Sequence, residues 1–128
     1  MITRVLVVED EAIAAMAMRL MLESLDCSVV GVASSGQAAV DLAGQHRPDV
    51  VLMDIRLKGE MSGVASARLI KGRLHIPVVF TTAYSAEEIR STCKVDDSFL
   101  FVSKPIREEE LARAISIARG EHNISAPL

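Results

Sequence analysis

Aromatic side chains are scarce in this chain, which has no Trp, one Tyr and three Phe among its 128 residues. A core must therefore be aliphatic, and half of all residues are hydrophobic. An excess of positive charge is also missing, because 14 Lys and Arg stand against 17 Asp and Glu, for a net charge of −3. Binding to a phosphate backbone usually needs a basic surface. We therefore expect no nucleic-acid partner.

Cysteines and long hydrophobic runs are few as well. Cys27 and Cys93 stand alone without a Cys-x-x-Cys pair, which favours reduced thiols in a cytoplasmic protein. The N-terminus shows no signal peptide, since residues 1–8 run directly into acidic residues. The longest apolar stretch, Ala12–Leu22, contains Arg19 and falls short of the roughly 20 residues that a membrane span needs. We expect a cytoplasmic protein without a membrane segment.

Apolar runs of strand length alternate with segments of helical periodicity. The expected strands are Arg4–Val8, Ser28–Ala33, Asp49–Asp54, Pro77–Thr82 and Ser98–Ser103. The expected helices are Ala12–Leu25, Gly36–Arg47, Ser62–Arg73, a fourth that begins at a Ser85/Glu88 capping box, and Glu108–Arg119. The strands are continuous apolar runs, which is typical of parallel strands covered on both faces. This predicts an α/β fold, a doubly wound five-stranded parallel sheet in a (βα)5 flavodoxin-like three-layer sandwich. One domain would cover residues 1–120, with a polar tail at 121–128.

The first helix carries more apolar residues than one face needs. The face expected to cover the sheet comprises Ile13, Met16, Ala17, Leu20 and Met21. Met18 and Leu22 add apolar groups beyond it. They predict either a broad buried face or a surface for a partner or a homodimer.

Functional side chains follow the carboxyl ends of four expected strands. They are Glu9 and Asp10, Asp54, Thr81 and Thr82, and Lys104. In doubly wound folds these ends meet at one edge of the sheet, where the functional crevice lies. Three carboxylates together are unfavourable without a cation. Oxygen ligands without Cys or His suit Mg²⁺ and not zinc.

A carboxylate beside Mg²⁺ can attack phosphorus and form an acyl phosphate. Lys104 would add a second positive charge, and Thr82 could donate a hydrogen bond to a phosphoryl oxygen. The crevice therefore predicts phosphoryl transfer onto a carboxylate.

Four motifs, in order and at the strand ends, carry a family resemblance. VLVVEDE, VLMDIRL, FTTAY and FVSKP together resemble the receiver domain of two-component response regulators, of the single-domain type. The resemblance covers essentially the whole chain. It implies that Asp54 is the phosphoacceptor, that Asp10 ligates Mg²⁺ directly, and that Glu9 acts mostly through water. Mn²⁺ could replace Mg²⁺.

The resemblance implies further roles around Asp54. The backbone carbonyl of Arg56 would be another metal ligand, and Thr82 and Lys104 would hold the phosphoryl group. Phe101 stands at the position of the aromatic switch residue, acting with Thr82, although a strand aromatic can equally be a core residue. Arg56 and Tyr84 would tune the lifetime of the phosphate, and Lys104-Pro105 would be a cis peptide.

The loop after the acceptor departs from the common receiver pattern. Lys58 stands where receivers commonly have Pro, and the loop DIRLKGEMSG has one residue more than the common form. It resembles a subgroup whose loop reads DI-x-L-x-x-G-x-x-G. The chemistry should survive this change, while the fit of a partner depends on the loop.

We therefore expect a stand-alone receiver that takes a phosphoryl group from a histidine kinase or a histidine phosphotransfer protein. It would signal by contacts with a downstream protein, and would assist its own phosphorylation and dephosphorylation without being a turnover enzyme. An interaction module not controlled by phosphorylation is the alternative. An aspartyl-phosphate phosphohydrolase fits less well, because Ala12 stands two residues after Asp10, where such enzymes have a second Asp. A P-loop is also disfavoured. Gly31 and Gly36 have the spacing of its glycines, but Gln37-Ala38 stands where Lys followed by Ser or Thr is required.

Overall fold

The computed structural model describes residues 2–57, 61–83, 87 and 99–120. Its strands are β1 (Arg4–Val8), β2 (Ser28–Ala33), β3 (Val50–Asp54), β4 (Val78–Thr82) and β5 (Leu100–Ser103). Its helices are α1 (Ala12–Ser24), α2 (Gly36–His46), α3 (Gly63–Leu69), the π-helical turn η1 (Ile70–Leu74) and α5 (Glu108–Ala118). Most of the expected boundaries agree to within one or two residues. The predicted capping box at Ser85 and Glu88 lies outside the described residues.

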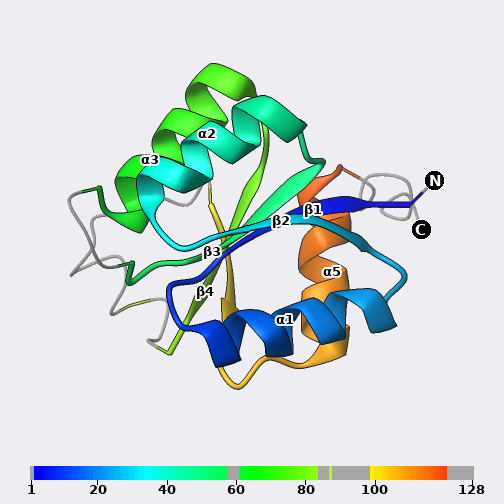
Figure 1. The fold of residues 1–128 in the computed structure, drawn as a ribbon. Coiled ribbons are helices and arrows are strands. Elements are labelled where there is room, and N and C mark those ends of the chain that lie inside the picture. Colours follow the sequence, from blue (N-terminus) through cyan, green and yellow to red (C-terminus); the bar gives the residue numbers. More distant parts are fainter. Residues whose placement is uncertain (1, 58–60, 84–86, 88–98, 121–128) are drawn as a thin grey trace.

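The five strands form one parallel sheet in the order β2-β1-β3-β4-β5. Figure 1 shows α2 and α3 on one face of this sheet, and α1 and α5 on the other. The predicted doubly wound three-layer architecture is confirmed. The strand order reverses beside β1, so the edge above β1 and β3 is where a functional crevice is expected.

Two apolar clusters, one on each face of the sheet, make up the core. Successive strand residues point to opposite faces, so Leu6 and Val8 belong to the cluster under α2 and α3, while Val5 and Val7 pack under α1 and α5. These side chains are almost completely buried. Burial of each contributes about 1.5–3 kcal/mol. Covering on both faces is the reason that the strands read as unbroken apolar runs.

The expected third helix is divided in the structure. Ser62 is its N-cap, with Oγ accepting a hydrogen bond from the Ala65 N–H at 3.0 Å. The α-helix ends at Leu69 and continues as the π turn η1, which His75 ends with a left-handed φ of 58°. The predicted helix Ser62–Arg73 therefore forms, but its last turn is π-helical and not α-helical.

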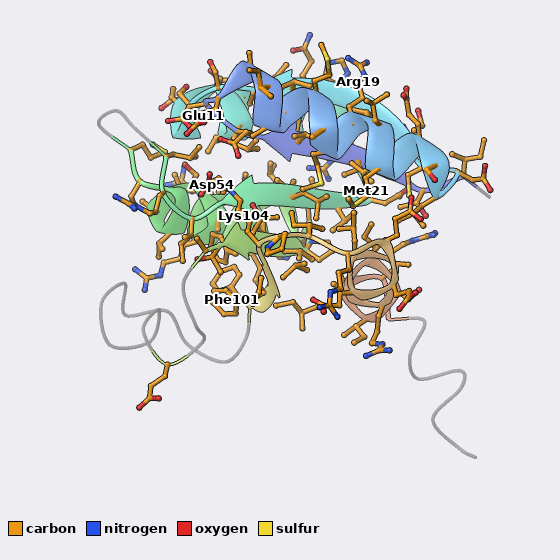
Figure 2. The ribbon with its side chains drawn as sticks, turned by 90° about the horizontal axis from the view of Figure 1, so that it is seen from below. Glu11, Arg19, Met21, Asp54, Phe101 and Lys104 are labelled. Atoms are coloured by element: carbon orange, nitrogen blue, oxygen red, sulfur yellow. The ribbon has the colours of Figure 1, made fainter. Side chains whose placement is uncertain are left out.

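The predicted face of α1 was wrong. Ile13, Met16 and Leu20 are 87%, 65% and 62% exposed, whereas Met18 and Leu22 are buried in the core under α1 and α5. Figure 2 shows Arg19 on the outer side of α1 and Met21 toward α5. Because apolar residues surround this helix, periodicity alone could not choose its inner side. The apolar row on its outside is formed by Ile13, Met16 and Leu20, and not by Met18 and Leu22.

Two further sequence expectations concern cysteines and membranes. Cys27 is a free, half-buried thiol, and Cys93 lies outside the described residues. Among the helices that the structure describes, each is too short or too polar to cross a membrane.

Candidate functional site

The predicted acidic cluster forms at the carboxyl edge of the sheet. Glu9 and Asp10 follow β1, and Asp54 ends the neighbouring strand β3. Each offers a carboxylate oxygen, and these oxygens lie within 4.8 Å of one another. Parallel pairing of β1 with β3 causes this convergence, because it aligns the carboxyl ends of both strands.

Asp54 is held at both carboxylate oxygens. Its Oδ1 accepts a hydrogen bond from the Arg56 N–H at 2.9 Å, and its Oδ2 accepts one from Lys104 Nζ at 3.2 Å. The backbone behind it is anchored too, since the Ile55 N–H donates to the Thr81 carbonyl at 3.2 Å. These contacts fix the carboxylate in a cleft of about 470 Å³. The cleft is lined by Asp10, Glu11, Asp54, Arg56, Leu57, Thr82, Ala83 and Lys104.

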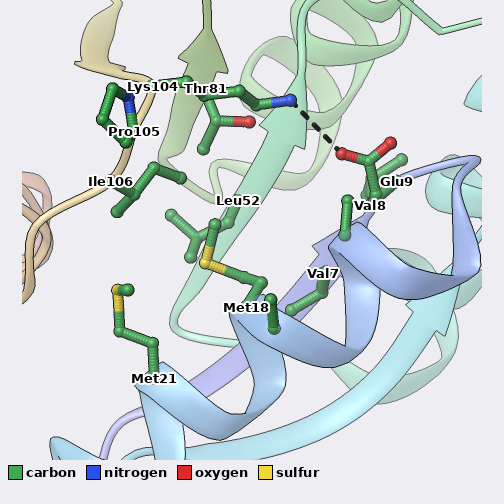
Figure 3. Close-up of a pocket in the computed structure, with 12 residues that line it drawn as sticks. Val7, Val8, Glu9, Met18, Met21, Leu52, Thr81, Lys104, Pro105 and Ile106 are labelled. Carbon is green, nitrogen blue, oxygen red and sulfur yellow. Dashed lines mark ion pairs between the residues drawn. The ribbon is translucent and has the colours of Figure 1, made fainter.

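Lys104 connects two of the three carboxylates. Its Nζ lies 3.5 Å from Glu9 Oε1 as well as 3.2 Å from Asp54 Oδ2, and Figure 3 shows the ion pair with Glu9. The Lys104 N–H donates to the Thr82 carbonyl at 2.7 Å, and the Lys104-Pro105 peptide is cis, as predicted. Burial acts to lower the pKa of Lys104, but the carboxylates of Asp54 and Glu9 outweigh it and hold this pKa above its usual value.

Glu9 is the most buried acid of the cluster, with 7% of its surface exposed. Its Oε2 accepts a hydrogen bond from the Glu11 N–H at 3.2 Å. The pKa of Glu9 is raised to about 6, chiefly because burial disfavours its charged form. The nearby Asp54 carboxylate also raises this pKa, whereas the Glu11 N–H and Lys104 act to lower it. The charged form of Glu9 is therefore energetically disfavoured unless a cation lies nearby.

The donor set fits a hard divalent cation. Three carboxylates and one ammonium leave a formal charge of −2 at the site, and the donors of the cluster are oxygens. Mg²⁺ prefers oxygen ligands and is commonly held by one or two carboxylates plus phosphate. Arg56, whose carbonyl is the further expected ligand, lines the same cleft.

Thr82 ends β4, as the sequence predicted, and Phe101 lies on the neighbouring strand β5. Thr82 is 2% exposed and lines the cleft beside Asp54. Phe101 is half-buried and stacks on Phe80, with ring centroids 5.5 Å apart. Its ring therefore packs on the core cluster under α2 and α3, and its switch role stays a prediction. Tyr84 lies outside the described residues.

Sequence reasoning missed an apolar groove that adjoins the site. The groove, of about 320 Å³, opens between α1 and the segment after β5, as Figure 3 shows. Met18, Met21 and Ile106 line its apolar part, and Glu9 and Lys104 line its other end. Residues far apart in sequence form this groove, so local motifs carried no sign of it.

A family model described as "Response regulator receiver domain" matches residues 5–116. The chain belongs to this family. The transcriptional regulatory protein PdtaR of Mycobacterium tuberculosis is 34% identical over 115 residues, which cover 90% of this chain and 56% of PdtaR. The phyllosphere-induced regulator PhyR of Methylorubrum extorquens is 33% identical over 119 residues, covering 92% of this chain and 44% of PhyR. This receiver thus spans about half the length of these relatives.

Other matches have nearly the length of this receiver. The polar-differentiation response regulator DivK of Brucella anthropi is 30% identical over 120 residues, covering 91% of this chain and 96% of DivK. The signal receiver domain of a modulated diguanylate cyclase from Desulfovibrio desulfuricans superposes with a TM-score of 0.83 at 32% identity, covering 98% of this chain and 99% of that domain. The receiver domain of the sensor histidine kinase PA1611 from Pseudomonas aeruginosa has a TM-score of 0.80 at 27% identity, covers 94% of this chain and 99% of that domain, and was solved with a magnesium ion in its active-site cleft.

Proposed function

We propose that this receiver accepts a phosphoryl group on Asp54, in a Mg²⁺-dependent reaction, from a histidine kinase or a histidine phosphotransfer protein. The observation that carries the proposal is the position of the Asp54 carboxylate. It has an oxygen within 4.8 Å of those of Glu9 and Asp10, and its Oδ2 lies 3.2 Å from the Lys104 ammonium. Magnesium in the cleft of the PA1611 receiver supports the choice of cation.

Asp54 acts as the nucleophile in this proposal. One of its carboxylate oxygens bonds to phosphorus as the bond from phosphorus to the donor's imidazole nitrogen breaks, which leaves an acyl phosphate. Glu9, Asp10, Asp54 and the Arg56 carbonyl would hold Mg²⁺, which supplies positive charge against the phosphoryl oxygens. Water is limited around Glu9 by its burial, so these charges interact more strongly there than on an open surface.

Lys104 and Thr82 act on the transferred group. The Lys104 ammonium, which pairs with Asp54 before transfer, then pairs with a phosphoryl oxygen. The Thr82 hydroxyl donates a hydrogen bond to another phosphoryl oxygen. Arg56, at the rim of the same cleft, tunes how long the phosphate survives, and so does Tyr84.

Phosphorylation then shifts an equilibrium that the free protein already has. Movement of Thr82 toward the phosphate would alter the packing around Phe101, on the neighbouring strand. The signal would be presented to a downstream protein by β5 and by the fourth helix that the sequence predicts, which lies largely outside the described residues. In this proposal the protein is cytoplasmic, and it promotes only its own phosphorylation and dephosphorylation.

The form in which the receiver acts is also part of the proposal. The match to DivK covers 96% of that response regulator and supports a receiver that acts alone through protein contacts. PdtaR and PhyR, of which only about half is matched, give the alternative, in which the receiver is joined to an output segment.

Direct phosphorylation tests the central step. The protein is incubated with acetyl phosphate and Mg²⁺, and its intact mass is followed by mass spectrometry. We expect an increase by one phosphoryl group that requires Mg²⁺ and disappears in Asp54→Asn. An unmodified wild-type protein, with partner binding that Asp54→Ala leaves unchanged, would instead favour an interaction module without phosphorylation.

A further inference from the structure

Gly63, the first residue of α3, lies directly against the backbone of the acceptor strand. A Cβ built on Gly63 would stand 2.8 Å from the carbonyl oxygen of Asp54 and 3.0 Å from that of Ile55. Real Cβ atoms essentially never approach backbone oxygens to 2.8 Å. Only hydrogen therefore fits between α3 and the peptide that carries Asp54, so glycine is required here for close approach and not for its conformational freedom.

The acceptor strand cannot give way to a side chain at this point. β3 is hydrogen-bonded between β1 and β4, and Asp54 pairs with Thr81 in the last rung of the ladder. The next residue is held too, because the Ile55 N–H donates to the Thr81 carbonyl at 3.2 Å. A displacement of the Asp54 or Ile55 carbonyl would break this end of the sheet.

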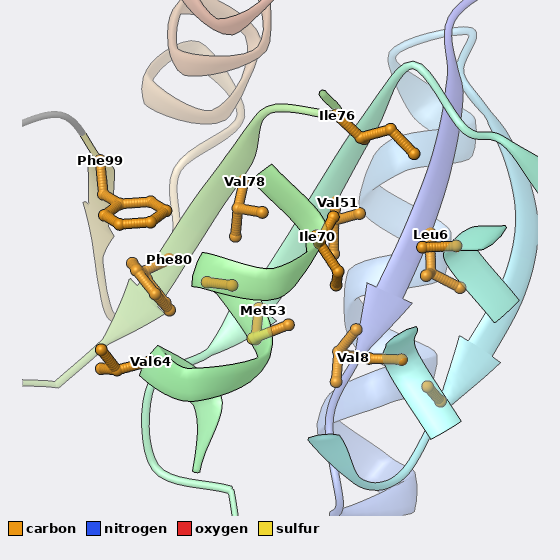
Figure 4. Packing of buried hydrophobic residues seen from close by; sticks show 14 of the residues in the cluster. Leu6, Val8, Val51, Met53, Val64, Ile70, Ile76, Val78, Phe80 and Phe99 are labelled. Atoms are coloured by element: carbon orange, nitrogen blue, oxygen red, sulfur yellow. The ribbon is translucent and has the colours of Figure 1, made fainter. Parts of the chain in front are cut away.

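The first turn of α3 is held equally firmly from its own side. The side chain of Ser62 caps the helix through the Ala65 N–H. Val64 and Ala67 are buried in the core cluster that contains Met53, and Figure 4 shows Val64 on α3 near Phe80. An added methyl group at Gly63 must therefore move either packed helix or paired strand.

The strand side of this contact holds the acceptor carboxylate. The peptide units of Asp54 and Ile55 lead to Arg56, whose N–H donates to Asp54 Oδ1 at 2.9 Å. Gly63 is thus in contact with the two carbonyls that separate the acceptor side chain from the N–H that orients it. Gly63, which follows the loop after Asp54, therefore contacts the peptide at which that loop begins.

We propose that Gly63 is a positioning residue for phosphoryl acceptance, fixing the Asp54–Arg56 backbone by allowing α3 to begin in contact with it. The inference rests on the proposed function of Asp54 and assigns it a neighbour outside the acidic cluster.

The chain supplies its own matched controls. A Cβ on Gly36, at the start of α2, would clash with Ser66 Oγ and would stand 2.7 Å from the Met61 carbonyl oxygen, and this clash does not involve Asp54. Gly44, within α2, has open space around it. Gly36→Ala therefore reports a clash with α3 and with the residue Met61 before it that leaves the Asp54 and Ile55 carbonyls untouched. Gly44→Ala reports the effect of a methyl group alone.

The test measures the rate of phosphorylation of the full chain by acetyl phosphate with Mg²⁺, corrected for the folded fraction from urea unfolding followed by circular dichroism. We expect Gly63→Ala to lower this rate by about tenfold or more, because small misplacements of a reacting group are costly. Gly36→Ala and Gly44→Ala should stay near the wild-type rate. Equal losses in Gly63→Ala and Gly36→Ala, or no loss in Gly63→Ala, would overturn the proposal.

A second readout separates this inference from the proposed function. If wild-type protein takes up no phosphoryl group, the proposed function fails, and Gly63 is judged by the amide NMR resonance of Arg56. Gly63→Ala should shift that resonance more than Gly36→Ala does, and an unmoved resonance would refute the positioning role.

A relief variant covers the case in which Gly63→Ala does not fold. Val64→Ala loosens the packing of the first turn of α3, so Gly63→Ala is then made in that background and compared with Val64→Ala alone. A slower rate in the double variant supports the proposal, and an unchanged rate contradicts it.

Discussion

Lys104 Nζ lies 3.2 Å from Asp54 Oδ2, although 50 positions separate the two residues in sequence. The pairing order of β3, β4 and β5 brings them together. The same ammonium lies 3.5 Å from Glu9, so one cation serves two carboxylates. Lys104 therefore compensates part of the negative charge of the cluster.

Replacement of Lys104 by Met should make the free energy of unfolding depend more strongly on Mg²⁺ than it does in the wild type. Without the ammonium, the negative charges of Glu9 and Asp54 lose their nearby positive partner. We therefore expect the free energy of unfolding to fall by on the order of 1 kcal/mol, a modest amount because Lys104 is partly exposed. Urea unfolding with and without Mg²⁺ measures it. Lys71→Met, which removes an ammonium on the π turn that lies 4.7 Å from the Phe99 ring centroid, is the control, and its stability should not depend on Mg²⁺ more strongly than that of the wild type. Equal stability of Lys104→Met and wild type without Mg²⁺ would contradict the expectation.

Stability without Mg²⁺ should rise as the pH falls through about 6. The pKa of Glu9 is raised from 4.5 to about 6 in the folded protein, so the folded state binds this proton before the unfolded state does. As the pH falls from 6 to 4.5, uptake of this proton by the folded state therefore increases the free energy of unfolding by on the order of 1 kcal/mol. Urea unfolding at several pH values in EDTA measures it.

The control for this pH dependence is Glu9→Gln. Glu9→Gln should be more stable than the wild type above pH 6. Its free energy of unfolding should not show the increase between pH 6 and 4.5 that protonation of Glu9 causes. A pH dependence that is the same in Glu9→Gln and wild type would assign the effect to other groups.

Mg²⁺ should stabilise the folded protein, and more strongly above pH 6 than below it, because protons compete for the ligand carboxylates. Saturation at about 100 times the dissociation constant would add about 2.7 kcal/mol to the free energy of unfolding.

The affinity for Mg²⁺ should fall at least about tenfold in Asp10→Asn, through loss of a charged ligand, as measured by calorimetric titration. The control is Asp41→Asn. Asp41 lies on an exposed part of α2, where its Oδ1 accepts a hydrogen bond from Gln37, and this variant should bind Mg²⁺ as the wild type does. Equal affinities in both variants would remove Asp10 from the metal site.

The outer row of α1 should tolerate polar substitution, whereas its inner side should not. Leu20→Lys exchanges an exposed side chain and should change the free energy of unfolding by no more than about 0.5 kcal/mol. Met18→Lys places a charge in the core under α1 and α5 and should cost about 3 kcal/mol or more. Urea unfolding compares them. The opposite ranking would restore the helical face first expected from the sequence.

The same variants test the hypothesis of a homodimer on α1. Because Met18 is buried, the surface available to a second copy is the row of Ile13, Met16 and Leu20. If the protein is a dimer through this row, Leu20→Lys shifts its mass by light scattering to that of a monomer. A mass unchanged by Leu20→Lys would exclude this row as the dimer contact.

The sequence alone determined the strands, their parallel arrangement and the composition of the site. Strand Val50–Asp54 is apolar at every position before Asp54, and this signal is local. Parallel strands align their carboxyl ends, so Glu9, Asp10, Asp54 and Lys104 could be placed at one edge before any contact was known. The local chemistry of each strand end was sufficient for this step.

Tertiary packing decided what the local pattern left open. The inner side of α1 was set by its contact with α5 and the sheet, which buries Met18 and leaves Ile13 exposed. The pKa of Glu9 depends on burial and on Asp54, 45 positions away along the chain. The contact between Gly63 and the Asp54 carbonyl exists only because α3 packs on β3. Periodicity reports which residues are apolar, but the distances between elements arise from how their side chains fill the space between them.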